Sequence, residues 1–159
     1  MDENALMSSL ELKIPPLALV ALCALAMWVL ARWLPFGAFA FVGARWVAAA
    51  LVLLGIAIAL AGVLAFRRHA TTVNPMTPER STTVVRDGIY RITRNPMYLG
   101  FVFALTGWGL HLGQVSALLM LIPFVGWLSR FQIVPEERAL RRQFGADYED
   151  YCRAVRRWI

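Results

Sequence analysis

Thirty-five consecutive residues without a charged side chain, Asn95 to Ser129, constrain this chain more than any other feature. Two shorter uncharged windows cover residues 14–31 and 46–66. A helix needs about 20 apolar residues to cross the hydrocarbon core of a bilayer, so the longest window can cross twice. Only 16% of the residues are charged, against about 25% in soluble domains. The sequence therefore predicts an all-α integral membrane protein.

The longest window can fold back at residues 111–114, where Gly113 can end a helix and polar neighbours can lie at a wet interface. Ala, Leu and small glycine surfaces dominate the two earlier windows, which we interpret as scaffold helices. No internal repeat or low-complexity linker divides the chain, so a single domain over 1–159 is expected. The four predicted transmembrane helices lie near 15–34, 46–66, 96–113 and 115–134.

Lys and Arg are distributed unevenly between the loops. Six lie in the 67–94 loop and seven in the 130–159 tail, but only two lie between the first two spans. The positive-inside rule then places both termini and the 67–94 loop in the cytoplasm, and we expect a bacterial inner membrane. The net charge of +6 is interpreted as a basic surface beside anionic membrane lipids, not as nucleic-acid binding.

The two cysteines, Cys23 and Cys152, fall in the first span and in the tail, so a disulfide between them is not expected. Neither has the His or Cys neighbours that a metal site requires, so no metal is assigned.

The loop and the tail are predicted to be ordered. The 67–94 loop has 28 residues, and its Thr, Val, Ile and Tyr content argues against disorder. Pro135 followed by two acids suits the first turn of a new helix. Gly145 is expected to end that helix and Asp147 to cap a second one. The tail is thus predicted to form two short cytoplasmic helices, whose apolar stripe we interpret as packing: Leu140, Phe144, Tyr148 and Tyr151.

The stretch from Arg94 to Tyr98 combines the features of an anion site. Asn95 and Pro96 suit the N-cap and first position of the third span, which would leave backbone N–H groups free to bind a carboxylate or phosphate. Arg94 adds a permanent charge, and Tyr90 and Tyr98 add rings with polar tips. The alternative is a well-capped membrane helix with an interfacial Tyr and Arg belt.

Two acids near the end of the fourth span could complement this anion site. Glu136 and Glu137 could bind an ammonium group there, and the combined pair of sites would suit an amino-acid moiety. The alternative is that both acids complement the dipole of a solvated helix.

Five short sequence motifs, taken in their order along the chain, resemble those of the membrane methyltransferase superfamily. That superfamily contains isoprenylcysteine carboxyl methyltransferases and bacterial phospholipid methyltransferase-like proteins. The resemblance covers roughly residues 70–159. Its pieces are Val84-Val85, Asp87-Gly88-Ile89-Tyr90, Arg94-Asn95-Pro96-Met97-Tyr98-Leu99-Gly100, Glu136-Glu137 with Leu140, and Phe144-Gly145-Ala146-Asp147-Tyr148.

The resemblance implies that the loop and tail enclose S-adenosylmethionine, while a gap between spans admits a lipidic or hydrophobic methyl acceptor. It implies no firm catalytic residue, and the candidates are Glu136, Glu137 and Tyr98. Apolar residues suited to an acyl or prenyl chain are Phe101, Phe103, Trp108 and Trp127. The cofactor contacts that it implies are Thr82, Thr83, Val84, Val85, Tyr90, Arg94, Asn95, Pro96, Met97, Tyr98 and Glu136.

The chain departs from the carboxyl methyltransferase branch at two positions. That branch commonly has His where this chain has Asn95, so a catalytic imidazole is not expected. It also has an Arg four residues before the Glu pair, where this chain has Gln132. Arg130 lies two residues away, about 200° around a helix. Arg130 and Gln132 are the candidate substrate residues, and an amine, thiol or other lipidic acceptor is favoured over a carboxylate.

Two alternative functions stay open. Sterol-reductase-like enzymes share an Arg-Asn-Pro-x-Tyr type of motif and use NADPH, but they are generally longer and have more spans. A non-enzymatic four-span membrane protein is the other alternative. A proton-coupled transporter usually has an ionisable group at mid-membrane, and none of the predicted spans carries a carboxylate there.

Overall fold

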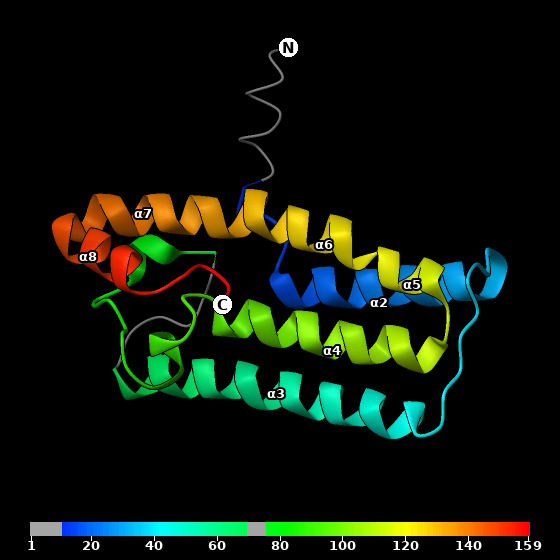
Figure 1. The fold of residues 1–159 in the computed structure, drawn as a ribbon. Coiled ribbons are helices and arrows are strands. Elements are labelled where there is room, and N and C mark those ends of the chain that lie inside the picture. Colours follow the sequence, from blue (N-terminus) through cyan, green and yellow to red (C-terminus); the bar gives the residue numbers. More distant parts are fainter. Residues whose placement is uncertain (1–10, 70–75) are drawn as a thin grey trace, which may run out of the picture.

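The protein is described by a computed structural model that covers residues 11–69 and 76–159. Over those ranges it is helical and contains no strand, apart from one isolated bridge between Ala38 and Gln114. The all-α prediction is confirmed (Figure 1). In chain order the elements are α2 (Pro16–Trp33), α3 (Ala44–Arg68), the 3-10 turns η1 (Pro78–Arg80) and η2 (Gly88–Arg91), α4 (Pro96–Leu112), α5 (Val115–Leu119), α6 (Leu121–Trp127), the π-helical η3 (Leu128–Ile133), α7 (Val134–Phe144) and α8 (Ala146–Ala154).

Helices α3 and α4 lie side by side along most of their length (Figure 1). Glycines on both helices make this close approach possible. A Cβ atom added at Gly55 would lie 2.7 Å from the backbone nitrogen of Ala104 and closer still to the carbonyl oxygen of Gly100. At Gly107, an added Cβ would lie 2.5 Å from the carbonyl oxygen of Ala48. The two backbones therefore touch without intervening side chains.

Three helices are long and apolar enough to cross a membrane: Pro16–Trp33, Ala44–Arg68 and a composite helix over Val115–Phe144. They correspond to the first, second and fourth predicted spans. Helix α4, the predicted third span, has 17 residues, which extend about 25 Å, a little less than the roughly 30 Å hydrocarbon core. An integral membrane protein is supported, and a full crossing by α4 stays a prediction.

Helix α7 begins at Val134, with Pro135 and both acids in its first turn as predicted, but it continues the preceding helix and is not a new one. Helix continues without a break from Leu121 to Phe144, after a turn at Met120 that separates α5 from α6, and η3 widens its turns just before the proline. A proline inside a helix leaves the carbonyl four residues earlier without its usual donor. Here that carbonyl is Phe131 O, and the Leu12 N–H donates to it at 3.0 Å. Helix α7 is thus an extension of the fourth span, and only α8 is a separate tail helix.

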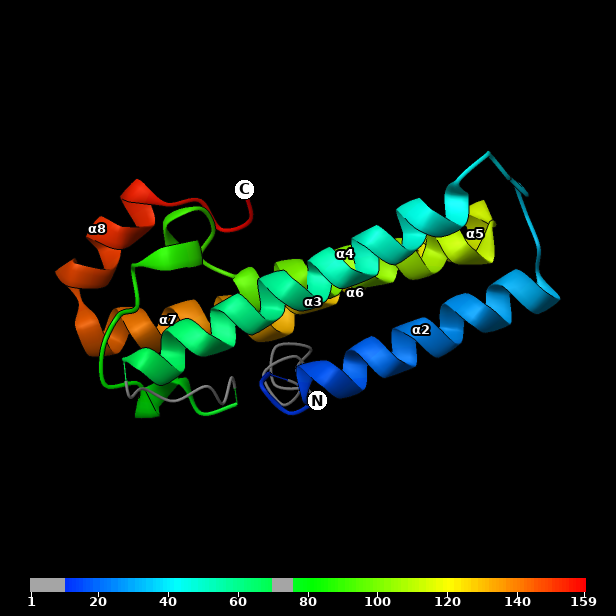
Figure 2. The ribbon, with the colours of Figure 1, turned by 90° about the horizontal axis from the view of Figure 1, so that it is seen from below.

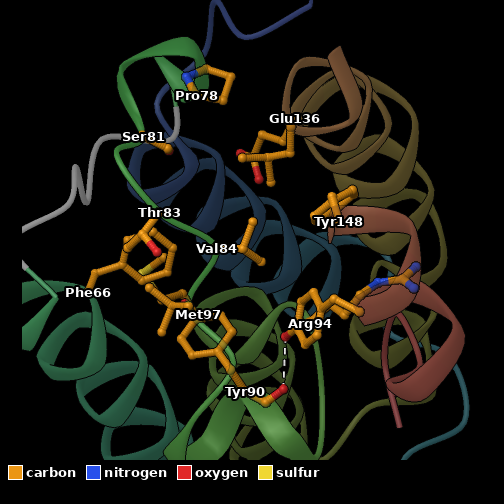
Figure 3. A pocket seen from close by; sticks show the side chains of 13 residues that line it. Phe66, Pro78, Ser81, Thr83, Val84, Tyr90, Arg94, Met97, Glu136 and Tyr148 are labelled. Carbon is orange, nitrogen blue, oxygen red and sulfur yellow. Dashed lines mark hydrogen bonds between the residues drawn. The ribbon is translucent and has the colours of Figure 1, made fainter. Parts of the chain in front are cut away.

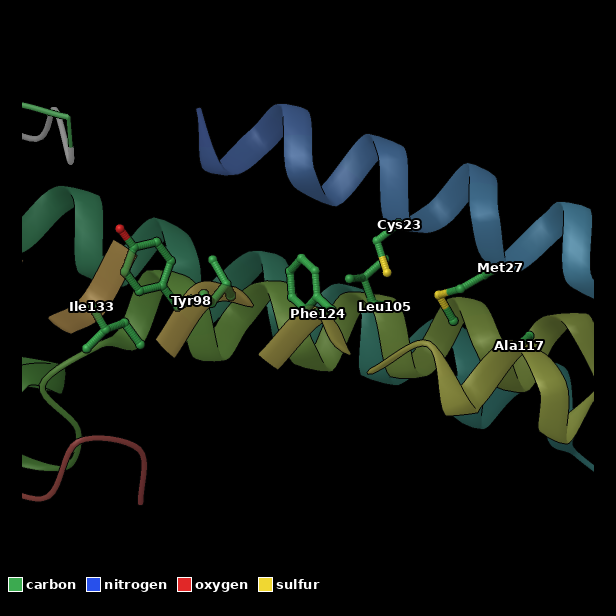
Figure 4. Close-up of a cluster of buried hydrophobic side chains, with 8 residues drawn as sticks. Cys23, Met27, Tyr98, Leu105, Ala117, Phe124 and Ile133 are labelled. Atoms are coloured by element: carbon green, nitrogen blue, oxygen red, sulfur yellow. The ribbon is translucent and has the colours of Figure 1, made fainter. Parts of the chain in front are cut away.

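The main apolar core lies between α2, α4 and the composite helix (Figure 4). Met27 points from α2 into this core and is completely buried, as is Leu128 of η3. The indole nitrogen of Trp108 donates to the carbonyl of Ala24 at 3.0 Å, which ties α4 to α2 within the apolar layer.

The connections divide between the two ends of the bundle (Figure 1 and Figure 2). One end carries the α2–α3 connection and the α4–α5 turn, where Gly113 has φ +65° and ends α4 as predicted. The other end, called the α8 end here, carries residues 76–95, α7, α8 and the C-terminal segment. The predicted loop is ordered where it is described, and its Asn74-Pro75 pair lies outside the described residues.

Gly145 separates α7 from α8 with φ +51°, so the predicted helix end there is confirmed. The predicted cap at Asp147 is wrong. Helix α8 begins one residue earlier, and the Asp147 carboxylate binds the guanidinium of Arg86 instead. The Asp147 side chain, which the sequence pattern assigned to capping, is instead engaged in an ion pair with Arg86, 61 residues away in the sequence.

Candidate functional site

A cavity of about 610 Å³, including its open mouth, lies at the α8 end of the bundle (Figure 3). Ser81 and Thr83 lie on one side of the cavity, opposite Glu136 and Tyr148. The lining residues are Phe66, Pro78, Ser81, Thr83, Val84, Val85, Tyr90, Arg94, Met97, Glu136, Leu140, Tyr148 and Tyr151.

Residues 81–85 of the loop form one wall of this cavity, and polar contacts fix this stretch to the helices around it. The side-chain amide of Gln143 on α7 donates to the carbonyl of Ser81. Arg86 donates to the backbone carbonyl of Asp147 and pairs with its carboxylate. At the end of α3, His69 Nε2 lies 3.0 Å from a carboxylate oxygen of Asp87. The extended stretch between Ser81 and Asp87 is therefore held at both ends.

Tyrosines from η2 and α8 form a buried floor. The Tyr151 hydroxyl donates to the carbonyl of Tyr90 at 2.8 Å. The rings of Phe66 and Tyr90 pack in a T-shaped arrangement, with 5.2 Å between ring centroids. Burial raises the pKa of Tyr90, Tyr148 and Tyr151 well above the ordinary tyrosine value. These hydroxyls are therefore neutral at physiological pH, and the floor offers aromatic surface without negative charge.

Arg94 lies at the inner end of the cavity and is held from several directions. Its Nη1 donates to the carbonyls of Cys152 and Val155, both at 3.0 Å, and its Nη2 donates to Glu137 Oε1 at 2.9 Å. Its buried Nε–H has no hydrogen-bond partner within the described part of the chain. A buried donor without an acceptor is costly, so this atom is suited to meet an acceptor on a ligand.

Adjacent acids on α7 have different roles in the structure. Glu137 is buried, and guanidinium groups of Arg94 and Arg157 occupy both of its oxygens. Arg141 adds a longer contact at 3.5 Å. Glu136 instead accepts a hydrogen bond from the Tyr98 hydroxyl and lines the cavity. Glu136 lines both this cavity and the smaller one beside it, whereas Glu137 lines only the smaller one and has guanidinium partners on both oxygens.

A smaller cavity of about 410 Å³ adjoins the first and shares Arg94, Met97 and Glu136 with it. Asn95, Pro96 and Tyr98 line this second space. A third, apolar groove of about 920 Å³ opens between the start of α2, α3 and α4. Its residues are Pro15, Pro16, Leu17, Ala59, Leu60, Val63, Met76, Met97, Tyr98 and Phe101.

Met97 lines all three spaces, and Tyr98 lines the groove and the smaller cavity. The polar cavity and the apolar groove therefore meet at the first turn of α4. One ligand could enter from the water side and another from between the helices, with their ends meeting beside Glu136.

The structure brings most of the predicted cofactor residues together. Thr83, Val84, Val85, Tyr90, Arg94, Met97 and Glu136 line the larger cavity, and Asn95, Pro96 and Tyr98 line the smaller one. Thr82 lines neither. Asn95 occupies the N-cap position of α4, but its side chain makes no capping hydrogen bond and donates to Arg157 O at 2.8 Å.

The predicted substrate residues lie away from these cavities. Arg130 pairs with Glu11 at 2.8 Å. Gln132 is buried and donates from its side-chain amide to the carbonyl of Ile14 at 2.6 Å. Both contacts hold the segment before α2 against the composite helix. Of the four predicted apolar acceptor residues, only Phe101 lines the groove.

Sequence reasoning missed several wall residues. The second span was interpreted as scaffold, yet Phe66 of α3 lines the cavity and Ala59, Leu60 and Val63 line the groove. The helical spacing of Leu140, Tyr148 and Tyr151 was visible, and these side chains both pack and line the cavity. Ser81 and Pro78 carried no signal of their own.

Metal binding was not expected, and the helices and loops that the structure describes contain no group of three or more His, Cys, Asp or Glu side chains suited to hold an ion.

Comparison with known proteins gives a match between residues 44–147 and the family described as phospholipid methyltransferase. An uncharacterized protein of Haemophilus influenzae is 41% identical over 63 residues, which are 40% of this chain and the whole of that protein. No solved structure matches the chain. The matched range runs from the first residue of α3 into α8 and contains most of the cavity and groove residues.

Proposed function

Since the chain belongs to the phospholipid methyltransferase family, we propose that it transfers a methyl group from S-adenosylmethionine to a lipidic or hydrophobic acceptor. The observation that carries this proposal is the junction at Met97, where the cavity lined by Arg94 and Glu136 meets an apolar groove between helices. A membrane methyltransferase must take one reactant from water and the other from lipid. This junction suits that requirement.

Three features of the larger cavity fit S-adenosylmethionine. The unpartnered Nε–H of Arg94 suits a carboxylate, and the Glu136 carboxylate suits an ammonium group. The rings of Phe66, Tyr90 and Tyr148 suit a flat base and a positively charged sulfur. When bound, this cofactor supplies a methyl group on a sulfonium that is already activated for displacement.

The chain's own residues then have three tasks. The loop and α8 exclude water from the cavity, since Val85, Tyr90 and Tyr151 are buried against one another. Met97 and Tyr98 orient the reacting end of the acceptor. Glu136 is the carboxylate placed to accept a proton from an amine or thiol acceptor, with the Tyr98 hydroxyl bonded to it. Glu137 cannot do so because guanidinium groups hold both of its oxygens.

The charge distribution supports a cytoplasmic site. Of the described residues, Arg80, Arg86, Arg91 and Arg94 lie in the segment at the α8 end, and α7 and α8 add further arginines. Because basic residues concentrate on the cytoplasmic side of membrane proteins, we infer that this end faces the cytoplasm, most simply in a bacterial inner membrane.

The proposal is tested by incubating membranes that contain the protein with methyl-labelled S-adenosylmethionine and then extracting lipid. Label in a lipid fraction, absent from membranes without the protein, is expected. Purified protein should bind S-adenosylhomocysteine; binding of NADPH without S-adenosylhomocysteine would favour a reductase. If Tyr98→Phe combined with Glu136→Ala left S-adenosylhomocysteine binding intact, the motif would be only a helix start, and a non-enzymatic protein would be favoured.

Filling the apolar groove is expected to weaken acceptor binding selectively. In Val63→Trp, a larger side chain occupies space that a lipid chain would use, and overpacking of this kind costs about 1–3 kcal/mol. The KM for the lipid acceptor should rise roughly tenfold, while the affinity for S-adenosylhomocysteine stays unchanged. Leu54→Trp is the matched control, because Leu54 is on the same helix, is exposed and does not line the groove. An equal rise in both variants would contradict the assignment of the groove.

A further inference from the structure

The C-terminal segment crosses directly over the stretch that begins α4. Figure 1 shows the C-terminus beside the start of α4. The Arg94 N–H donates to the carbonyl of Arg156 at 3.0 Å. The Thr93 hydroxyl and the Asn95 amide both donate to the carbonyl of Arg157, at 3.2 and 2.8 Å. Three consecutive residues before α4 are thus bound to two consecutive carbonyls of the C-terminal segment.

Arg157 adds a side-chain contact to the same region. Its Nε donates to Glu137 Oε1 at 3.0 Å, and its Nη2 donates to Oε2 at 2.8 Å. Paired contacts of this kind fix both partners in one orientation. Arg157 lines neither of the two polar cavities. Any influence on a ligand there must pass through Glu137.

Glu137 transmits that influence to two cavity residues. Its Oε1 also accepts from Arg94 Nη2 at 2.9 Å, and Arg94 is the cavity residue whose buried Nε–H has no partner among the described residues. Glu137 also directly follows Glu136 on α7, so the orientation of its side chain helps to fix that turn of the helix. The Glu137 carboxylate therefore helps to position both charged groups that line the cavity, the Arg94 guanidinium and the Glu136 carboxylate.

We propose that Arg157 is a positioning residue for the cofactor site. It holds Glu137, and through Glu137 it holds the guanidinium of Arg94 in the orientation that a carboxylate-bearing ligand requires. This inference rests on the proposed function, because it concerns binding of S-adenosylmethionine in the larger cavity.

A purely structural role is expected to give a different result. About 38% of the Arg157 side chain is exposed, whereas only 4% of the Glu137 side chain is. Without the Arg157 guanidinium, Glu137 keeps Arg94 and Arg141 as partners, and the carbonyl of Arg157 keeps its two donors. The protein should therefore stay folded when this side chain is shortened, while Glu137 loses both Arg157 bonds and holds Arg94 Nη2 less rigidly; the two carbonyl contacts of Arg94 Nη1 remain.

The test compares Arg157→Ala and Arg157→Lys with the matched control Arg156→Ala, in full-length protein in detergent. Arg156 is the exposed neighbour, and the substitution removes the same charge but keeps the backbone carbonyl. In Arg157→Ala, the dissociation constant for S-adenosylhomocysteine and the KM for S-adenosylmethionine should rise about tenfold, with a smaller change in kcat. Arg157→Lys should lie between, since it can form one of the two bonds. Added methylguanidinium should restore binding to Arg157→Ala and leave Arg156→Ala unchanged.

The outcomes separate this inference from the function on which it rests. If the unaltered protein does not bind S-adenosylhomocysteine, the proposed function fails. If it binds but Arg157→Ala matches Arg156→Ala, the positioning role fails. It also fails if Arg157→Ala unfolds at a clearly lower temperature and neither lysine nor methylguanidinium restores binding, because that result describes a structural contact alone.

Discussion

Glu136→Gln is expected to lower the efficiency of methyl transfer by roughly 10- to 100-fold, with most of the loss in cofactor affinity. The substitution keeps the shape of the side chain and an oxygen that can accept from Tyr98, and it replaces the charged carboxylate by a neutral amide with one acceptor fewer. A hydrogen bond to a charged partner contributes about 1.5–3 kcal/mol, and each 1.4 kcal/mol corresponds to about tenfold. Calorimetric titration with S-adenosylhomocysteine and steady-state turnover would measure the two parts.

Glu149→Gln is the control for this variant. Glu149 is an acid on α8 that pairs with Arg141 at 3.0 Å, and it does not line the cavities. The affinity for S-adenosylhomocysteine should not change in this control. An unchanged affinity in Glu136→Gln as well would exclude Glu136 from the cofactor site. In that case, a fall in turnover alone would point to proton transfer from the acceptor.

Gly55→Ala is expected to destabilise the helix bundle by about 1–3 kcal/mol or more. The new methyl group would lie 2.7 Å from the backbone nitrogen of Ala104 and against the carbonyl of Gly100. Backbone atoms cannot rotate away as a flexible side chain can, so α3 and α4 would have to separate. Thermal unfolding in detergent should show a lower midpoint. Gly55 lines none of the three spaces, so any loss of activity would follow from this separation.

Gly126→Ala is the matched control, and unlike Gly55→Ala it is not expected to destabilise the helix bundle. A Cβ added at Gly126 meets nothing within 4 Å, and replacing a helical glycine by alanine favours the helix by up to about 1 kcal/mol. The unfolding midpoint should stay the same or rise. Equal midpoints for Gly55→Ala and Gly126→Ala would mean that the close contact between α3 and α4 does not contribute to stability.

Much of the membrane architecture could be predicted because it depends on local composition. Uncharged windows fix where helices can cross, and Gly113 and Gly145 end helices because the left-handed conformation suits glycine. The motif from Arg94 to Tyr98 was also recognisable, because the start of a helix is a local feature with fixed spacing. The family match over residues 44–147 agrees with that resemblance.

Features that depend on distant partners could not be predicted. Pro135 usually signals a helix start, but the Leu12 N–H satisfies the carbonyl that the proline leaves free, and the helix continues. Asn95 usually caps a helix, but the carbonyl of Arg157 takes its side chain. Glu136 and Glu137 are equivalent in sequence, and only the folded arrangement of Arg94 and Arg157 distinguishes the acid that they bind from the one that lines the larger cavity.

The composite helix over Val115–Phe144 has a consequence for the acceptor of the proposed reaction. Its 30 residues extend about 45 Å, whereas the hydrocarbon core is about 30 Å thick. On the proposed topology, the roughly 15 Å that exceed the core thickness lie at the α8 end and carry Glu136. Bilayer thickness therefore sets the height of this carboxylate above the lipid tails. A membrane of different thickness would present a different segment of each lipid at that height, so the same site would select acceptors partly by the distance between chain and headgroup.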